Sequence, residues 1–282
     1  MLGAVIAAMA LGVGRTSWKA YRAERLLAFE RHPLRGATAE GSGLAGAVEV
    51  EYGLSDGAPL RGWYAASRNG AAIVFVHGAG GDRRTLAREA ALLGGAGYGV
   101  LLIDLPGLGE SGGRITCGRT EEAAIATAVD WLARRGASRI GGLGFSLGSQ
   151  LLAHVAAADP RLRAVVLEAA STSIVDRIRA MQGRSAWLTT LPATLAFFQE
   201  GTNPWRDQAR ESVGAIPPRK LLLIAGTRDG MATPAMAREL AARAGPSAGL
   251  EMFDTGHGGY WEADATRYTS LLLSFFAAAL ST

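Results

Sequence analysis

The sequence predicts an α/β domain whose mostly parallel sheet of about eight strands carries helices on both faces. Two observations support this prediction. Short, continuous apolar runs alternate with stretches of helical length from residue 71 onward, and each of several runs ends in a group of Gly, Asp, Ser or His residues. In addition, the chain has 282 residues, of which 49% are apolar and 19% charged, so it is long and apolar enough to bury one large core.

The elements follow one another in a regular order. Residues 48–52 and 60–65 alternate in polarity around the turn sequence Ser55-Asp56-Gly57, which predicts an antiparallel hairpin. The expected buried strands are residues 71–76, 100–103, 139–145, 164–167, 221–225 and 250–253, and the expected helices are residues 83–93, 120–135, 147–158, a helix starting at Thr233-Pro234, and 264–280. Strands that alternate with helices in this way imply a parallel sheet with right-handed crossovers.

The N-terminal segment, residues 1–36, differs in composition from the rest. Residues 1–14 are apolar and uncharged, and basic residues follow at positions 15, 19, 22, 25, 31 and 35. A helix of about 14 residues spans only ~21 Å of a ~30 Å bilayer core, although basic side chains can extend its reach by snorkelling. We expect a helical membrane anchor with its basic side in the cytoplasm, and the alternative is a helix that packs on the protein's own surface. The glycine-rich residues 37–47 read as a linker.

Residues 48–282 form the main domain in this interpretation, interrupted by an insertion at about residues 171–215. The insertion has no buried strand, but it is rich in large apolar side chains, namely Trp187, Leu188, Leu191, Leu195, Phe197, Phe198 and Trp205. We expect a short helical cap over the carboxyl edge of the sheet. Its aromatic residues either line a pocket for an apolar acyl or alkyl chain or pack the cap onto the sheet.

The central motif is Gly144-Phe145-Ser146-Leu147-Gly148, between the strand that ends at 145 and the helix that starts at 147. Glycine two residues away on each side of a serine is the pattern of a nucleophile elbow, in which a tight turn exposes a strained serine. The helix N-terminus beside Ser146 would favour an oxyanion. Glycine-rich turns of this kind also bind phosphates, so the motif needs support from other residues.

A nucleophilic serine needs a base and a residue that orients the base. His257 fits the base best, because it follows the last strand in a glycine-rich loop. Asp229 follows the preceding strand, so the order is Ser, Asp, His, and we expect Asp229 to orient the imidazole. Glu168, at the end of the strand before, is the alternative acid, whereas Asp254 lies too close to His257 in sequence.

The oxyanion hole would use two backbone N–H groups. One belongs to Leu147, directly after the nucleophile, and the other to Ala79, in the loop after the first parallel strand. Glycines at positions 78, 80 and 81 would allow this loop to approach the substrate.

Taken together, His77-Gly78, residues 104–112, residues 144–148, residues 226–229 and Gly256-His257 resemble the α/β-hydrolase superfamily. The pattern is most similar to bacterial Bem46-like and serine aminopeptidase (S33)-like hydrolases, and it covers residues 48–280. The resemblance implies an α/β-hydrolase fold and a serine hydrolase that cleaves carboxylic esters or related acyl bonds through an acyl-enzyme on Ser146. Members of this group often carry an N-terminal hydrophobic anchor, which would associate the protein with a membrane and leave its catalytic domain in the cytoplasm; a soluble cytoplasmic protein is the alternative.

Other classes fit the composition less well. The net charge of +4 comes from scattered arginines, so we expect no nucleic-acid partner, and the single Cys117 excludes an internal disulfide. No cluster of metal ligands is visible, so no cofactor or metal is expected, and the expected partner is a small acyl ester with an apolar chain. A peptidase or amidase of the same fold and a non-catalytic binding protein remain alternatives, and the oligomeric state stays open.

Overall fold

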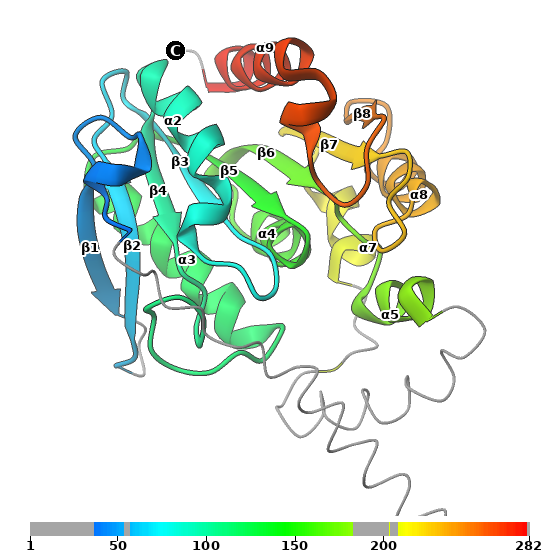
Figure 1. Ribbon diagram of the computed structural model, residues 1–282, viewed down its shortest axis with the longest axis horizontal. Coiled ribbons are helices and arrows are strands. Elements are labelled where there is room, and N and C mark those ends of the chain that lie inside the picture. Colours follow the sequence, from blue (N-terminus) through cyan, green and yellow to red (C-terminus); the bar gives the residue numbers. More distant parts are fainter. Residues whose placement is uncertain (1–36, 54–56, 183–202, 204–207, 281–282) are drawn as a thin grey trace, which may run out of the picture.

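The computed structural model describes residues 37–53, 57–182, 203 and 208–280 (Figure 1). The expected anchor, residues 1–36, and the apolar and aromatic residues of the expected cap therefore lie outside the described residues, and both expectations stay predictions. Within the described ranges, no helix has both the length and the apolar character needed to cross a bilayer.

One sheet organises the domain. Its strands are β1 (Val48–Gly53), β2 (Pro59–Ala65), β3 (Ala71–Val76), β4 (Gly99–Ile103), β5 (Arg139–Phe145), β6 (Leu162–Glu168), β7 (Lys220–Gly226) and β8 (Gly249–Phe253). Their spatial order is β1-β2-β4-β3-β5-β6-β7-β8. The β1–β2 hairpin is antiparallel and β2 pairs antiparallel with β4, while the pairs from β4 to β8 are parallel. The predicted fold class, with an eight-stranded and mostly parallel sheet, is confirmed.

Helices cover both faces of this sheet (Figure 1). They are α2 (Ala87–Gly95), α3 (Arg119–Arg134), α4 (Leu147–Ala158), α5 (Ile174–Gln182), α7 (Gln208–Ser212), α8 (Pro234–Ala244) and α9 (Tyr260–Leu280), with 3₁₀ turns η1 (Glu40–Ser42), η2 (Arg83–Leu86) and η4 (Val213–Ala215). Alternate side chains of the central strands divide between two cores. The core that contains Val74, Leu101 and Val165 packs against α3, α4 and α8, and the core that contains Phe75, Leu102 and Val166 packs against α2 and α9.

Two helices start differently from the sequence-based expectation, and each has a side-chain cap near the expected start. The helix expected from residue 83 begins as the 3₁₀ turn η2, at whose start the Asp82 carboxylate accepts the N–H of Arg84 and the Thr85 hydroxyl accepts the N–H of Asp82. The helix expected from Asp264 begins earlier, at Tyr260, but Asp264 itself has non-helical backbone angles. Its carboxylate accepts the N–H of Arg267, so it caps the second part of α9.

The segment 37–47 requires a correction. Its small, glycine-rich composition predicts a linker, but Ala39, Leu44 and Ala47 are buried in the core beside α2. The small residues allow the backbone to lie close to the domain, and the 3₁₀ turn η1 begins directly after Ala39. The compact domain therefore includes these residues and begins before β1.

The two described ends of the expected insertion lie together near the carboxyl edge of β6. Asp176, in α5, accepts hydrogen bonds from Thr172 and Ser173 and from the guanidinium of Arg210, in α7, at 2.7 Å for Arg210. The backbone N–H of Arg210 also bonds to the carbonyl of Thr172.

Candidate active site

Four predicted site segments follow parallel strands and therefore meet at one edge of the sheet. Ala79 follows β3, Ser146 follows β5, Asp229 follows β7 and His257 follows β8. Parallel strands point the same way, so their carboxyl ends bring residues that are distant in sequence to the same place, where ligands of open α/β sheets bind.

Ser146 occupies a strained turn between β5 and α4. Its backbone angles are φ 53° and ψ −115°, and it is one of the described non-glycine residues with positive φ. Such a conformation typically costs about 1–3 kcal/mol and persists only where the surroundings enforce it. Close packing does so here: a Cβ at Gly148 would lie 2.2 Å from the carbonyl oxygen of Val76, so only glycine allows α4 to approach β3 this closely.

Ser146, His257 and Asp229 form a continuous hydrogen-bonded chain. The Ser146 Oγ lies 2.8 Å from His257 Nε2, and His257 Nδ1 lies 2.7 Å from Asp229 Oδ2. An ionised carboxylate can only accept, so Nδ1 carries the proton and Nε2 is free to accept the hydroxyl hydrogen of Ser146. This is the tautomer that a general base at this position requires.

The environment of Asp229 keeps its carboxylate charged and fixed. Its side chain has no solvent exposure. Burial by itself would raise the pKa of Asp229, but the hydrogen bond from His257 and those from the N–H groups of Met231 and Ala232 lower it below its usual value. The two backbone bonds, at 2.8 and 2.9 Å, both go to Oδ1, which leaves Oδ2 for His257.

Glu168, the alternative acid, is directed elsewhere. Its carboxylate oxygen lies 2.5 Å from the hydroxyl of Tyr268 in α9, and the described bonds of His257 go to Asp229 and Ser146. The main-chain carbonyl of Glu168 accepts the N–H of Ser146, so this residue touches the nucleophile turn through its backbone. Asp254 is exposed and pairs with Arg228 and Thr227.

The loop expected to supply an oxyanion donor lies against the nucleophile. A Cβ at Gly78 would be 3.1 Å from the Cβ of Ser146 and 3.2 Å from the Phe145 ring, so this loop approaches as closely as glycine permits. Ala79, the next residue, is half-buried, and Leu147 is fully buried as the first residue of α4. Both expected donors therefore flank the Ser146 turn.

A buried histidine fixes this loop. His77 Nε2 accepts the N–H of Leu105 at 3.0 Å, so Nδ1 must carry the proton and donates it to the carbonyl of Gly78 at 2.8 Å. Burial lowers the pKa of His77, which favours the neutral ring that this arrangement needs. His77 thus joins the loop after β3 to the loop after β4 and does not act as a base.

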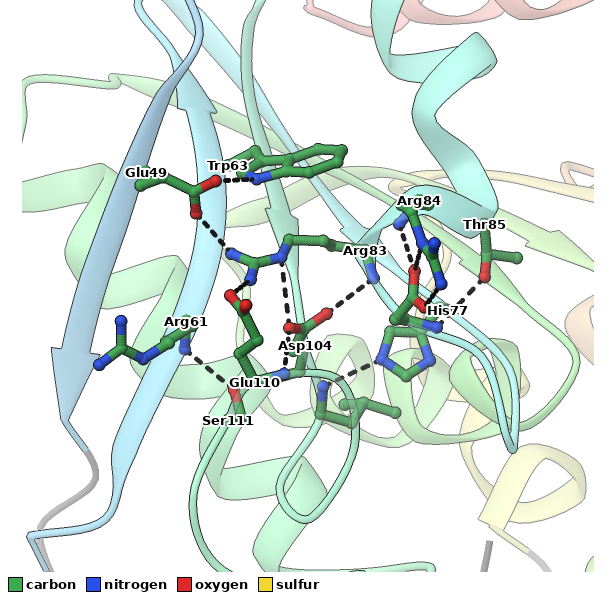
Figure 2. A network of polar contacts seen from close by, with 12 residues as sticks. Glu49, Arg61, Trp63, His77, Arg83, Arg84, Thr85, Asp104, Glu110 and Ser111 are labelled. Atoms are coloured by element: carbon green, nitrogen blue, oxygen red, sulfur yellow. Dashed lines mark hydrogen bonds and ion pairs between the residues drawn. The ribbon is translucent and has the colours of Figure 1, made fainter. Parts of the chain in front are cut away.

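Arg83, just after the loop that follows β3, connects this loop to neighbouring elements through its hydrogen bonds (Figure 2). Its side chain is fully buried, and its guanidinium bonds to Glu49 at 2.8 Å and to Glu110. Its backbone N–H donates to Asp104 Oδ1 at 2.7 Å, and the indole N–H of Trp63 holds the second oxygen of Glu49 at 2.7 Å. One buried cation therefore connects β1, the loop after β3 and the loop after β4.

Sequence reasoning did not identify Arg83 or Phe145 as part of this region. The Phe145 ring lies 5.3 Å from the His257 ring, and a Cβ at Gly258 would be 3.2 Å from it. The position of Phe145 inside the pentapeptide was the available signal for it. An arginine directly after the Gly-rich loop carried no comparable signal, because arginines occur throughout this sequence.

Comparison with known proteins bears on the fold of the chain. A family model described as the alpha/beta hydrolase fold matches residues 71–202. No curated protein sequence matches the chain.

Solved structures show the same fold at low identity. An esterase from Pyrococcus furiosus, Pf2001, is 22% identical with a TM-score of 0.71, over 86% of this chain and 96% of that one. The α/β hydrolase GrgF from Penicillium sp. is 19% identical with a TM-score of 0.68, over 84% and 99%. An enol-lactonase from Burkholderia xenovorans is 21% identical with a TM-score of 0.62, over 81% and 100%. The narrower likeness to Bem46-like and S33-like hydrolases stays a prediction. The eight-stranded sheet, the family match over residues 71–202 and these structures together show that the chain has the α/β-hydrolase fold.

Proposed function

We propose that the protein is a serine hydrolase that cleaves carboxylic esters or related acyl bonds through an acyl-enzyme on Ser146. The observation that carries this proposal is the hydrogen-bonded chain from Asp229 through His257 to Ser146, with contacts of 2.7 and 2.8 Å. These distances lie within the range that direct proton transfer needs. The esterase and lactonase among the similar structures support an ester bond, since a lactone is an internal ester.

In the first half of the proposed reaction, His257 Nε2 accepts the hydroxyl proton of Ser146 while Oγ attacks the carbonyl carbon of the ester. The carbonyl oxygen becomes an oxyanion, and the backbone N–H groups of Ala79 and Leu147 stabilise it. When the intermediate collapses, the C–O bond to the leaving alcohol breaks and His257 gives that alcohol its proton. Asp229 holds the imidazole in place and stabilises its cationic form.

In the second half, His257 takes a proton from water, whose oxygen attacks the acyl carbon. Collapse of the second intermediate breaks the bond to Ser146 Oγ, which regains its proton from His257. The products are a carboxylic acid and the free enzyme, and no step needs a group outside the chain and water. The substrate is a small molecule, and the aromatic content of residues 171–215 favours an apolar acyl or alkyl chain.

A fluorophosphonate probe tests the mechanism, because it phosphonylates only an activated serine. We expect the intact protein to be labelled and Ser146→Ala to be unlabelled. Absence of labelling in the intact protein would favour a non-catalytic binding role. A panel of p-nitrophenyl esters of increasing acyl length, run beside aminoacyl amides, then separates an esterase from a peptidase, and a preference for the amides would contradict the proposed bond type.

A further inference from the structure

A pocket of about 230 Å³ adjoins His257 and Phe145, and two carboxyl groups that the proposed reaction does not use line it. Glu168 is the last residue of β6, and Glu89 lies in α2. Both are buried, and in the part of the chain that the structure describes neither forms an ion pair with an arginine or lysine. Two unpaired buried carboxylates would be costly, so their protonation state requires an explanation.

Two side chains of α9 join these carboxyl groups. The Tyr268 hydroxyl lies 2.5 Å from Glu168 Oε1 and 3.3 Å from Glu89 Oε1, and the Trp261 indole N–H donates to Glu89 Oε1 at 2.7 Å. The two carboxyl groups therefore meet across one phenol oxygen, within one cluster of four side chains.

The number of hydrogens available at this cluster points to a retained proton. The single hydroxyl hydrogen of Tyr268 can serve only one of its two carboxyl neighbours, so the other contact would set two acceptor oxygens against each other unless a carboxyl group carries a proton. Burial and the neighbouring charge of Glu89 raise the pKa of Glu168 well above its usual value. Burial also raises the pKa of Glu89.

The same cluster is connected to the Ser146 turn on one side and to the loop that carries His257 on the other. The main-chain carbonyl of Glu168 accepts the N–H of Ser146 at 2.8 Å and the hydroxyl of Ser149 at 2.7 Å. On the other side, Trp261 lies in the first turn of α9, directly after the loop that carries His257. A change in the distance between Glu168 and Trp261 would thus move the nucleophile relative to its base.

We propose, building on the proposed function, that Glu89 and Glu168 share one proton at neutral pH and that this protonated pair positions the Ser146 turn against the His257 loop. Release of the proton leaves two like charges in a buried site, and their repulsion through Tyr268 separates β6 from α2 and α9. Glu89 and Glu168 are positioning residues in this role, and the activity then falls on the alkaline side.

Other charged or titratable groups face the pair from each packed element. They are Arg88 of α2, His257 and Asp229 of the proposed catalytic chain, and Tyr260 and Glu262 of α9. Arg88 forms an exposed ion pair with Glu262 at 2.8 Å, and its guanidinium lies 4.4 Å from the centre of the Trp261 ring. Burial raises the pKa of Glu89, and the charge of Arg88 opposes this effect only in part. Asp229 is already bound to His257.

The first test compares pH–rate profiles of the wild type, Glu168→Gln, Glu89→Gln and the control Glu262→Gln. Glutamine keeps the shape and an acceptor oxygen but cannot ionise. We expect the alkaline loss of activity to move upward by at least about one pH unit in either buried variant. The control, which removes an exposed carboxylate at the rim of the same pocket, should follow the wild-type profile. Profiles with the same alkaline limb in all four proteins would overturn the proposal.

A second measurement does not depend on catalysis. Carboxyl groups with a raised pKa in the folded state make the free energy of unfolding fall as pH rises above their unfolded value of about 4.3. The Tm of the wild type should therefore decrease more steeply with rising pH than that of Glu168→Gln or Glu89→Gln. Equal slopes would contradict the shared proton. If the slopes differ as expected but the wild type is not labelled by the fluorophosphonate, the proton pair stands and the proposed function fails.

Discussion

The substitution Asp229→Asn gives the sharpest test of the proposed catalytic chain, because the structure fixes how the amide would be oriented. Asp229 Oδ1 accepts two backbone N–H groups, from Met231 and Ala232, and Oδ2 accepts His257 Nδ1. An asparagine that keeps its oxygen toward the two backbone donors must turn its NH₂ group toward His257. The imidazole then has to accept at Nδ1 and carry its proton on Nε2, where it can no longer take the proton of Ser146.

The size of the expected loss of kcat follows from the free-energy cost of turning the new amide of Asp229→Asn so that its oxygen faces His257. Turning the amide would set its NH₂ group against both backbone donors, and leaving two buried donors unsatisfied costs about 1–3 kcal/mol each. At 1.36 kcal/mol per factor of ten, the productive orientation becomes about 30-fold to 10⁴-fold rarer. We expect the loss of kcat to lie near the upper end, since a neutral amide also fails to stabilise the imidazolium. KM should change little, because Asp229 has no exposed surface for a substrate to touch.

The assay is hydrolysis of a p-nitrophenyl ester together with the rate of fluorophosphonate labelling. Asp254→Asn is the matched control: it makes the same chemical change three residues from His257, on a side chain that is 80% exposed and bound to Arg228. The control should keep wild-type activity. A folded Asp229→Asn protein with kcat within about tenfold of wild type would refute the orientation argument, because even its lowest estimate exceeds that value.

Three further predictions concern the surroundings of the site. Arg83→Met should destabilise the protein by about 3 kcal/mol in urea unfolding, the lower end for a broken buried pair: Asp104, 3.3 Å from the Arg83 Nε, is buried, but Glu49 and Glu110 are half-exposed. Arg88→Met, which breaks an exposed pair with Glu262, should cost less than about 1 kcal/mol. Gly148→Ala should abolish activity and lower Tm, because its Cβ would lie 2.2 Å from a β3 carbonyl, while Gly95→Ala, with nothing within 4 Å, should behave as wild type in both measurements. Burial lowers the pKa of His77, so as pH drops the unfolded state binds a proton before the folded state does, and the free energy of unfolding should fall below a pH of about 6.5. His77→Gln lacks this proton site, so a slope of Tm against pH equal to that of the wild type would contradict the prediction.

Most of the fold could be predicted because its signals are local. The apolar runs that predicted β3 and β5 have the observed bounds, Ala71–Val76 and Arg139–Phe145, since a parallel strand buried on both faces reads as a continuous apolar run. The cap Thr233 and the first-turn Pro234 start α8 as expected. The small residues at 37–47 were misread as a linker, because composition alone does not show that Ala39 and Leu44 meet α2.

The sequence left two acids open for the candidate site, Asp229 and Glu168, because both follow neighbouring strands and reach the same edge of the sheet. Only the tertiary structure distinguishes their side chains: Asp229 turns toward His257, and Glu168 turns toward Tyr268. The role of Arg83 was equally hidden, since its carboxylate partners Glu49, Asp104 and Glu110 lie 34, 21 and 27 residues away.

The order of elements and the position of the nucleophile turn were thus determined by the sequence itself, through hydrophobic periodicity and the steric demand for glycine on both sides of Ser146. The hydrogen-bond partners of the buried charged groups were decided only in the folded chain. The donors that distinguish the buried carboxyl groups come from distant parts of the sequence: His257 for Oδ2 of Asp229, Tyr268 for Glu168 and Trp261 for Glu89. For this reason the α/β-hydrolase fold could be anticipated from the motifs, whereas the proton that we propose Glu89 and Glu168 to share could be inferred only from their meeting in space.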